Sequence, residues 1–151
     1  MPDDSELIAL YSGQILALAA DIPHAELLET SMAQVKKRAP LCGSNVMVSL
    51  DYDGNNITRF GQDVKACALG QASASILGAH VIGATESQIQ SARDQLYALL
   101  KSDGPTPVAP FEKYEVLRPA RSYKNRHASI MLAVEATLEA IDTAKKMPQP
   151  E

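Results

Sequence analysis

Polar and hydrophobic residues alternate in two neighbouring stretches in the first half of the chain. Residues 45–52 alternate, the turn-forming sequence Asp53-Gly54-Asn55-Asn56 follows, and residues 57–64 form the second stretch. This pattern predicts a β-hairpin with antiparallel arms. Residues 32–39 alternate in the same way and predict one further short strand ahead of the hairpin.

Four other stretches carry hydrophobic residues at the spacing of an amphipathic helix. The predicted helices span residues 5–20, 68–80, 85–101 and about 125–146. Asp4 or Ser5 is available as the N-cap of the first helix, and a capping-box pattern from Thr85 to Gln88 opens the third. The first helix is expected to present an apolar face made of Leu7, Ile8, Leu10, Ile15, Leu16 and Leu18.

The stretches between these elements are less regular. Residues 24–31 fit a helix and an irregular loop equally well. The remaining predictions are a loop rich in Pro and Gly at 102–110, a short helix at 111–117, a break at 118–121 and a disordered tail at 147–151. Because too little chain follows the loop at 102–110 to build a second core, we expect a single domain over residues 1–146.

Composition and charge exclude several kinds of partner. The chain has 151 residues, of which 46% are hydrophobic and 21% charged, as in soluble globular proteins. The formal net charge is -4, and the run Lys36-Lys37-Arg38 is too short to indicate a nucleic-acid surface, although it fits a solvated strand edge or a contact with an acidic protein. No apolar run is long enough to span a membrane, and the acidic N-terminus lacks the positive charge of a secretory signal. We therefore expect a cytoplasmic protein with neither nucleic acid nor membrane as a partner.

Two cysteines, Cys42 and Cys67, carry the candidate chemistry. Cys42 lies in a turn-like stretch before the hairpin, and Cys67 follows the hairpin, where an extended segment gives way to a helix. Antiparallel pairing brings Ser44 and Lys65 to the open end of the hairpin, so we expect the two sulfur atoms near each other. A helix N-terminus favours a thiolate, the form that binds metal or attacks sulfur; the alternative for Cys67 is a small buried core residue.

The residues around these cysteines resemble motifs of the U-type iron–sulfur cluster scaffold family, which includes NifU N-terminal, IscU-like and SufU-like proteins. Ala39-Pro40-Leu41-Cys42-Gly43-Ser44 stands where that family has Asn-Pro-x-Cys-Gly-Asp. Ala66-Cys67-Ala68, followed by Ala72-Ser73-Ala74-Ser75, matches Gly-Cys-Ala followed by Ala-Ser-x-Ser. Arg126-His127-Ala128-Ser129-Ile130 takes the place of His-Cys-Ser-x-Leu, so Ala128 replaces the third cysteine.

The resemblance covers most of the chain and carries expectations for both fold and function. It implies an α+β fold, in which a small antiparallel sheet of about three strands packs with about four to six helices. It also implies a scaffold without enzymatic activity, which receives sulfur from a cysteine desulfurase, accepts iron and passes a cluster to acceptor apoproteins.

Two site positions of the family differ in this chain. Ala128 has no ligating atom, and Ser44, in place of the family's aspartate, has a hydroxyl that stays protonated. A cluster or a zinc ion needs about four thiolate, imidazole or carboxylate donors. The two cysteines supply two; His127 is a candidate third donor or a capping histidine, and Asp63 a candidate fourth or a solvated strand-end carboxylate. The implied cofactor is an iron–sulfur cluster or a single zinc or iron ion, or none if the missing cysteine abolishes binding.

Three functions fit these residues. The first is a divergent scaffold or carrier that uses Cys42, Cys67 and His127, with a cluster bridging two chains of a homodimer as one arrangement. The second is an interaction protein that kept the fold and the desulfurase-facing surface but lost metal chemistry. The third is a thiol or persulfide carrier in which the two cysteines exchange sulfur or form a disulfide. We expect no hydrolase, since the chain lacks a Gly-x-Ser-x-Gly elbow and a phosphate-binding glycine loop.

Overall fold

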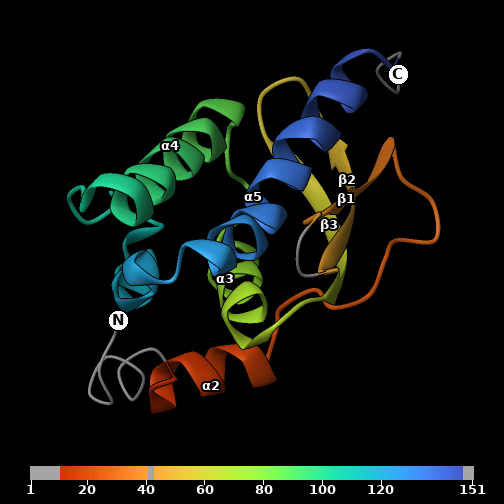
Figure 1. Cartoon of the computed structure of the whole chain (residues 1–151). Helices are drawn as coiled ribbons and strands as arrows, with labels where there is room; N and C mark the ends of the chain where they lie inside the picture. Colours follow the sequence, from red (N-terminus) through yellow and green to blue (C-terminus); the bar gives the residue numbers. More distant parts are fainter. Residues whose placement is uncertain (1–10, 41–42, 148–151) are drawn as a thin grey trace.

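The computed structural model describes residues 11–40 and 43–147 (Figure 1). Within these residues, three strands form one antiparallel sheet, and four α-helices and one 3₁₀ helix accompany it, which confirms the expected α+β fold. In chain order the elements are α2 (Gly13–Ala20), β1 (Ala33–Arg38), β2 (Asn45–Tyr52), β3 (Ile57–Lys65), α3 (Ala68–Gly78), α4 (Glu86–Ser102), η1 (Glu112–Ser122) and α5 (Lys124–Lys145).

The sheet has the strand order β1-β2-β3, and its hairpin forms where the sequence predicts it. Asp53 fixes the turn, because its carboxylate accepts hydrogen bonds from the backbone N–H groups of Asn55 and Asn56 at 2.8 and 2.7 Å. At the opposite, open end, Asn45 pairs with Lys65, and Arg38 of the edge strand β1 pairs with Asn45. The Cys42 motif directly precedes β2 and Cys67 directly follows β3, so both cysteine motifs adjoin the open end of the hairpin in the sequence.

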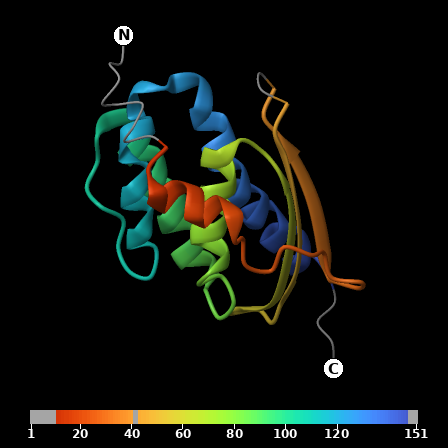
Figure 2. The same cartoon turned by 90° about the horizontal axis from the view of Figure 1, so that it is seen from below.

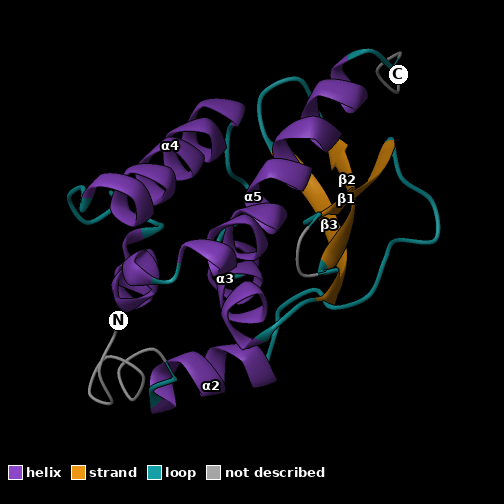
Figure 3. Cartoon of the chain, viewed as in Figure 1, coloured by secondary structure: helices purple, strands orange, loops and turns teal. Residues whose placement is uncertain are grey.

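The helices cover one face of the sheet (Figures 2 and 3). The helix α5 packs directly on β1 and β2, and α3 packs between α5 and α2. Both α3 and α5 are buried along most of their length, and small residues such as Gly70 and Ala72 let the two helices approach closely. This packing sets the N-terminus of α3 against the first turns of α5.

The first helix differs from the prediction. It begins at Gly13, where the Ser12 hydroxyl accepts a hydrogen bond from the Ile15 N–H at 3.4 Å, and Tyr11 and Ser12 themselves are not helical. A single helix over residues 5–20 is therefore wrong at this point, while the proposed caps Asp4 and Ser5 lie outside the described residues. Leu16, expected on the apolar face, is 51% exposed.

The stretch 24–31 is irregular, which decides between the two predicted alternatives. It crosses the outer face of the sheet, where the Leu28 N–H donates to the Ser49 hydroxyl at 2.9 Å. Gly61 of β3 makes this crossing feasible, because a Cβ at that position would collide with the Glu26 carbonyl oxygen. The loop thus covers the part of the outer face that carries Ser49 and Gly61.

The second half of the chain follows the predicted elements with shifted ends. The capping box of Thr85 and Gln88 opens α4 as predicted. The predicted break at residues 118–121 is wrong, because η1 continues through Pro119, supported by the ion pairs of Arg118 with Glu115 and Asp103. No helix within the described residues is long and apolar enough to cross a membrane. The predicted tail lies outside the described residues except for Met147.

Candidate functional site at the N-terminus of α3

Cys67 occupies the junction between β3 and α3, as the sequence predicts. It is the N-cap residue of α3, with an extended backbone (φ -66°, ψ 169°), and its carbonyl oxygen accepts the first helical hydrogen bond from the Gln71 N–H at 2.9 Å. Its thiol is half-buried and forms no disulfide within the described residues.

One serine lies against this thiol, and a second serine is bonded to the first. The Cys67 sulfur is 3.5 Å from the Ser129 hydroxyl oxygen of α5. The Ser129 hydroxyl donates in turn to the Ser44 hydroxyl at 3.1 Å, and both serines are buried. Because the Ser129 hydroxyl donates to Ser44, its oxygen is free to accept a hydrogen bond from the Cys67 thiol.

Gly70 makes the contact between Cys67 and Ser129 sterically feasible. Gly70 lies one helical turn after Cys67, facing α5. A Cβ atom at Gly70 would stand 2.5 Å from the Ser129 hydroxyl oxygen and 3.2 Å from the Ser129 carbonyl oxygen. The absence of a side chain at Gly70 therefore lets α5 pack close to the start of α3.

Two of the other predicted donors are Cys42 and Asp63. Cys42 lies outside the described residues, so the expected proximity of the two sulfur atoms stays a prediction. Asp63 sits on β3, where it pairs across the sheet with Met47 and forms a 3.9 Å ion pair with Lys65. Its side chain is about half exposed, as a solvated strand-end carboxylate would be.

His127 is buried in the first turn of α5. Its Nε2 is 2.9 Å from the carbonyl oxygen of Ala120, and because a carbonyl oxygen only accepts, Nε2 carries the ring hydrogen. Burial lowers the pKa of His127, so the imidazole is neutral at pH 7. In this tautomer Nδ1 carries the lone pair, so Nδ1 is the ring atom that would bind a metal.

The two remaining family positions differ in their surroundings. Ala128 is exposed on α5, between the buried residues His127 and Ser129. Ser44 is buried and bonded to Ser129, so the position of the family's aspartate is part of the polar contact beneath Cys67. Over the described ranges, which exclude Cys42, no three side chains of His, Cys, Asp or Glu come together as a metal-binding group.

The sequence reasoning missed Ser129 as a site residue. It stands in the third motif, next to the lost cysteine, and the helical repeat places consecutive residues about 100° apart. A buried Ser129 beside an exposed Ala128 is the result. The signal was the polar residue within the apolar face of α5, opposite a glycine in α3.

The protein is thus an α+β protein with a thiol at the N-terminus of a helix, in contact with a serine of a second helix, and the comparisons with known proteins give the family. Over 95% of this chain and 99% of the other, the structure matches the N-terminal part of a nitrogen-fixing NifU-like protein from Brucella abortus with a TM-score of 0.91 and 36% identity. The chain belongs to the NifU/IscU-like scaffold family.

Two further solved structures share the fold at lower identity. One is assigned as an iron–sulfur cluster assembly scaffold protein for the SUF system of Fervidobacterium islandicum, with a TM-score of 0.77, 17% identity and coverage of 89% of this chain and 98% of that one. The other is a hypothetical protein with a TM-score of 0.75, 21% identity and the same coverage of both chains. No family model and no curated protein matches the sequence.

Proposed function

We propose that the protein is a cytoplasmic iron–sulfur cluster scaffold or carrier without enzymatic activity. It receives sulfur from a cysteine desulfurase, accepts iron and passes the assembled cluster to acceptor apoproteins. The cluster is its cargo. The observation that carries this proposal is the position of Cys67 at the N-terminus of α3, against Ser129, in a chain 36% identical to a NifU-like protein.

The donor set of one chain is small for a cluster, which favours weak holding and release. Cys42 and Cys67 supply two thiolates, and the Nδ1 of His127, which is buried and has no hydrogen-bond partner among the described residues, is the candidate third donor. A cluster needs about four donors. The proposal therefore includes a cluster shared between two copies of the chain, each contributing both thiolates.

Anaerobic reconstitution tests this function. The full chain is incubated with ferrous iron and sulfide, or with a cysteine desulfurase and cysteine as the sulfur source. We expect sulfur-to-iron charge-transfer absorbance, iron and sulfide in equal amounts, and a dimeric species on gel filtration. Cys67→Ser and Cys42→Ser are each expected to abolish the absorbance. Wild-type protein without a charge-transfer band, or variants that keep it in full, would refute the proposal.

The partly accessible thiol of Cys67 favours a second candidate, a persulfide carrier. Cys67 touches a hydroxyl, and its thiol is partly accessible. In this function the Cys67 thiolate attacks the terminal sulfur of a desulfurase persulfide, a Cys67 persulfide forms, and the desulfurase cysteine leaves as a thiolate. No external oxidant or reductant is required.

Mass spectrometry tests the second candidate, and the charge-transfer absorbance obtained with iron separates it from the first, because a scaffold also receives sulfur from the desulfurase. After incubation with desulfurase and cysteine but without iron, a carrier gains the mass of one sulfur atom on Cys67, and Cys67→Ser does not. Desulfurase binding with neither cluster nor persulfide would instead support the interaction protein that has lost sulfur and metal chemistry.

A further inference from the structure

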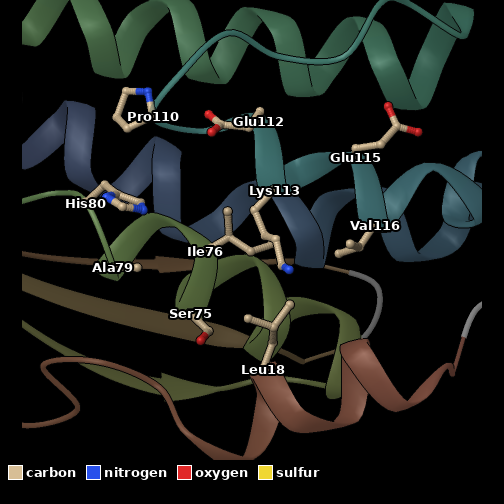
Figure 4. A pocket seen from close by; sticks show the side chains of 10 residues that line it. All are labelled: Leu18, Ser75, Ile76, Ala79, His80, Pro110, Glu112, Lys113, Glu115 and Val116. Atoms are coloured by element: carbon tan, nitrogen blue, oxygen red, sulfur yellow. The ribbon is translucent and has the colours of Figure 1, made fainter.

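A hollow of about 450 Å³ lies at the other end of α3 from Cys67. Figure 4 shows it between α2, the C-terminal half of α3 and η1. Because α3 has 11 residues, its two ends are about 15 Å apart, and this hollow is separate from the thiol site. The volume falls within the range of about 300–1,000 Å³ that is common for small-molecule sites.

The walls of the hollow are mainly aliphatic. Leu18 comes from α2, Ile76 and Ala79 line it at the end of α3, and Val116 comes from η1. Ile76 is buried in the core, so this wall is held in place by the packing of α3. An alkyl chain placed here would exchange water for aliphatic contact at about 25 cal/mol per Å² of buried apolar area.

Lys113 brings a positive charge to the mouth of this hollow. In Figure 4 its side chain runs past Ile76, and its ammonium group ends close to Leu18. Across the described part of the chain, no residue forms an ion pair or hydrogen bond with Lys113. Asp21, which lines a smaller adjoining hollow of about 240 Å³ together with Lys113, is not paired with it either.

The acidic residues of η1 are turned to other partners or to the rim. Glu115 accepts hydrogen bonds from Arg118 and Thr106 and points away from the hollow in Figure 4. The carboxylate of Glu112 lies near Pro110 at the far rim. A negative group beside Lys113 is therefore separated from these two carboxylates.

The surroundings decide which head group fits. A phosphate needs several donors, such as an arginine pair or a row of backbone N–H groups, whereas Lys113 is the one lysine or arginine among the described residues that line this hollow. The imidazole of His80 lies on the other side of Ile76 in Figure 4. A single carboxylate matches a single ammonium group. We propose that this hollow binds a medium-chain aliphatic monocarboxylate, with the alkyl chain against Ile76 and Val116 and the carboxylate paired with Lys113.

Octanoate tests this proposal on the full chain. Titration into isotope-labelled protein, below the micellar concentration, is expected to give saturable 1:1 binding with NMR shifts confined to α2, the end of α3 and η1. Lys113→Met keeps the aliphatic stem and removes the charge, so we expect affinity to fall at least about fivefold. The matched control is Lys36→Met, an exposed lysine on β1, which is expected to bind like wild type.

A second variant and two further probe molecules test the contributions of the alkyl chain and of the negative charge. Ala79→Phe fills the hollow from an exposed position without removing a core side chain, and should abolish binding while the melting temperature stays close to that of wild type. Acetate and octylamine should both bind much more weakly than octanoate. Absence of saturable octanoate binding, equal affinity in Lys113→Met, or equal binding of octylamine would overturn the proposal. A protein with Cys42→Ser and Cys67→Ser should bind octanoate unchanged, which keeps this test independent of the cluster function.

Discussion

The Cys67 sulfur and the Ser129 hydroxyl oxygen, 62 positions apart in the chain, lie 3.5 Å from each other. This contact links the start of α3 to the start of α5 and turns an isolated thiol into one with a defined neighbour. Because Ser129 is bonded to buried Ser44 as well, a second hydroxyl group fixes the one that touches the thiol.

Loss of the Ser129 hydroxyl should make the Cys67 thiol easier to alkylate. In a Cys42→Ser background, where Cys67 is the single cysteine, we expect Ser129→Ala to raise the rate of Cys67 alkylation by iodoacetamide about two- to tenfold. This range corresponds to one hydrogen bond of about 0.5–1.5 kcal/mol. Ser91→Ala, an exposed serine of α4, is the control. An unchanged rate in Ser129→Ala would show that the contact does not restrain the thiol.

Gly70→Ala should destabilise the protein although alanine is the better helix former. The new Cβ would stand 2.5 Å from the Ser129 hydroxyl oxygen, and the resulting strain should exceed the gain of about 1 kcal/mol in helix propensity. We expect a net loss of about 1–2 kcal/mol in the free energy of unfolding, measured by urea denaturation. Gly13→Ala meets no atom within 4 Å and should stabilise the fold slightly.

His127 can be tested as a ligand separately from its structural role. His127→Gln keeps an N–H donor for the Ala120 carbonyl oxygen and removes the lone pair of Nδ1. If His127 holds the cluster, reconstituted Gln variant should bleach faster in the presence of a chelator while its melting temperature stays within a few degrees of wild type. Equal bleaching rates would assign His127 to packing alone.

Restoring a thiol at position 128 should strengthen cluster retention. Ala128 is exposed, so Ala128→Cys should change stability by less than about 0.5 kcal/mol. The added thiolate raises the number of donors per chain, and we expect slower transfer of the cluster to a chelator than in wild type. A transfer rate equal to that of wild type would mean that position 128 does not face the cluster. Ser122→Cys, an exposed residue of η1, controls for a thiol elsewhere.

The lowered pKa of Glu115 predicts that the folded state loses stability in acid. Hydrogen bonds from Arg118 and Thr106 lower the pKa of Glu115 to about 2, against 4.5 for a free carboxyl group. The folded state therefore binds this proton less readily than the unfolded state. The stabilisation is complete above about pH 4.5 and disappears as the pH falls to about 2. Glu115→Gln should flatten the pH dependence of the unfolding free energy in this window; an unchanged slope would contradict the assignment.

The sequence predicts the hairpin and the position of Cys67 because both depend on local chemistry. The turn signal at Asp53 and the alternation of its arms fix the register, and the register fixes which ends meet. The partners of Cys67 depend on the packing of α5 against α3, which no local pattern encodes, so Ser129 was missed. The continuation of η1 through Pro119 likewise depends on Arg118 reaching Asp103 at the end of α4.

The edge strand β1 ends in the basic run Lys36-Lys37-Arg38, and the side chains of Lys36 and Arg38 are exposed. An uncovered strand edge is a template on which a second molecule can add its own strand and start aggregation. Two like-charged copies of this run repel each other at close range. The charges on this edge strand therefore oppose edge-to-edge association and fibril growth, and neutralising them should lower the solubility of the protein.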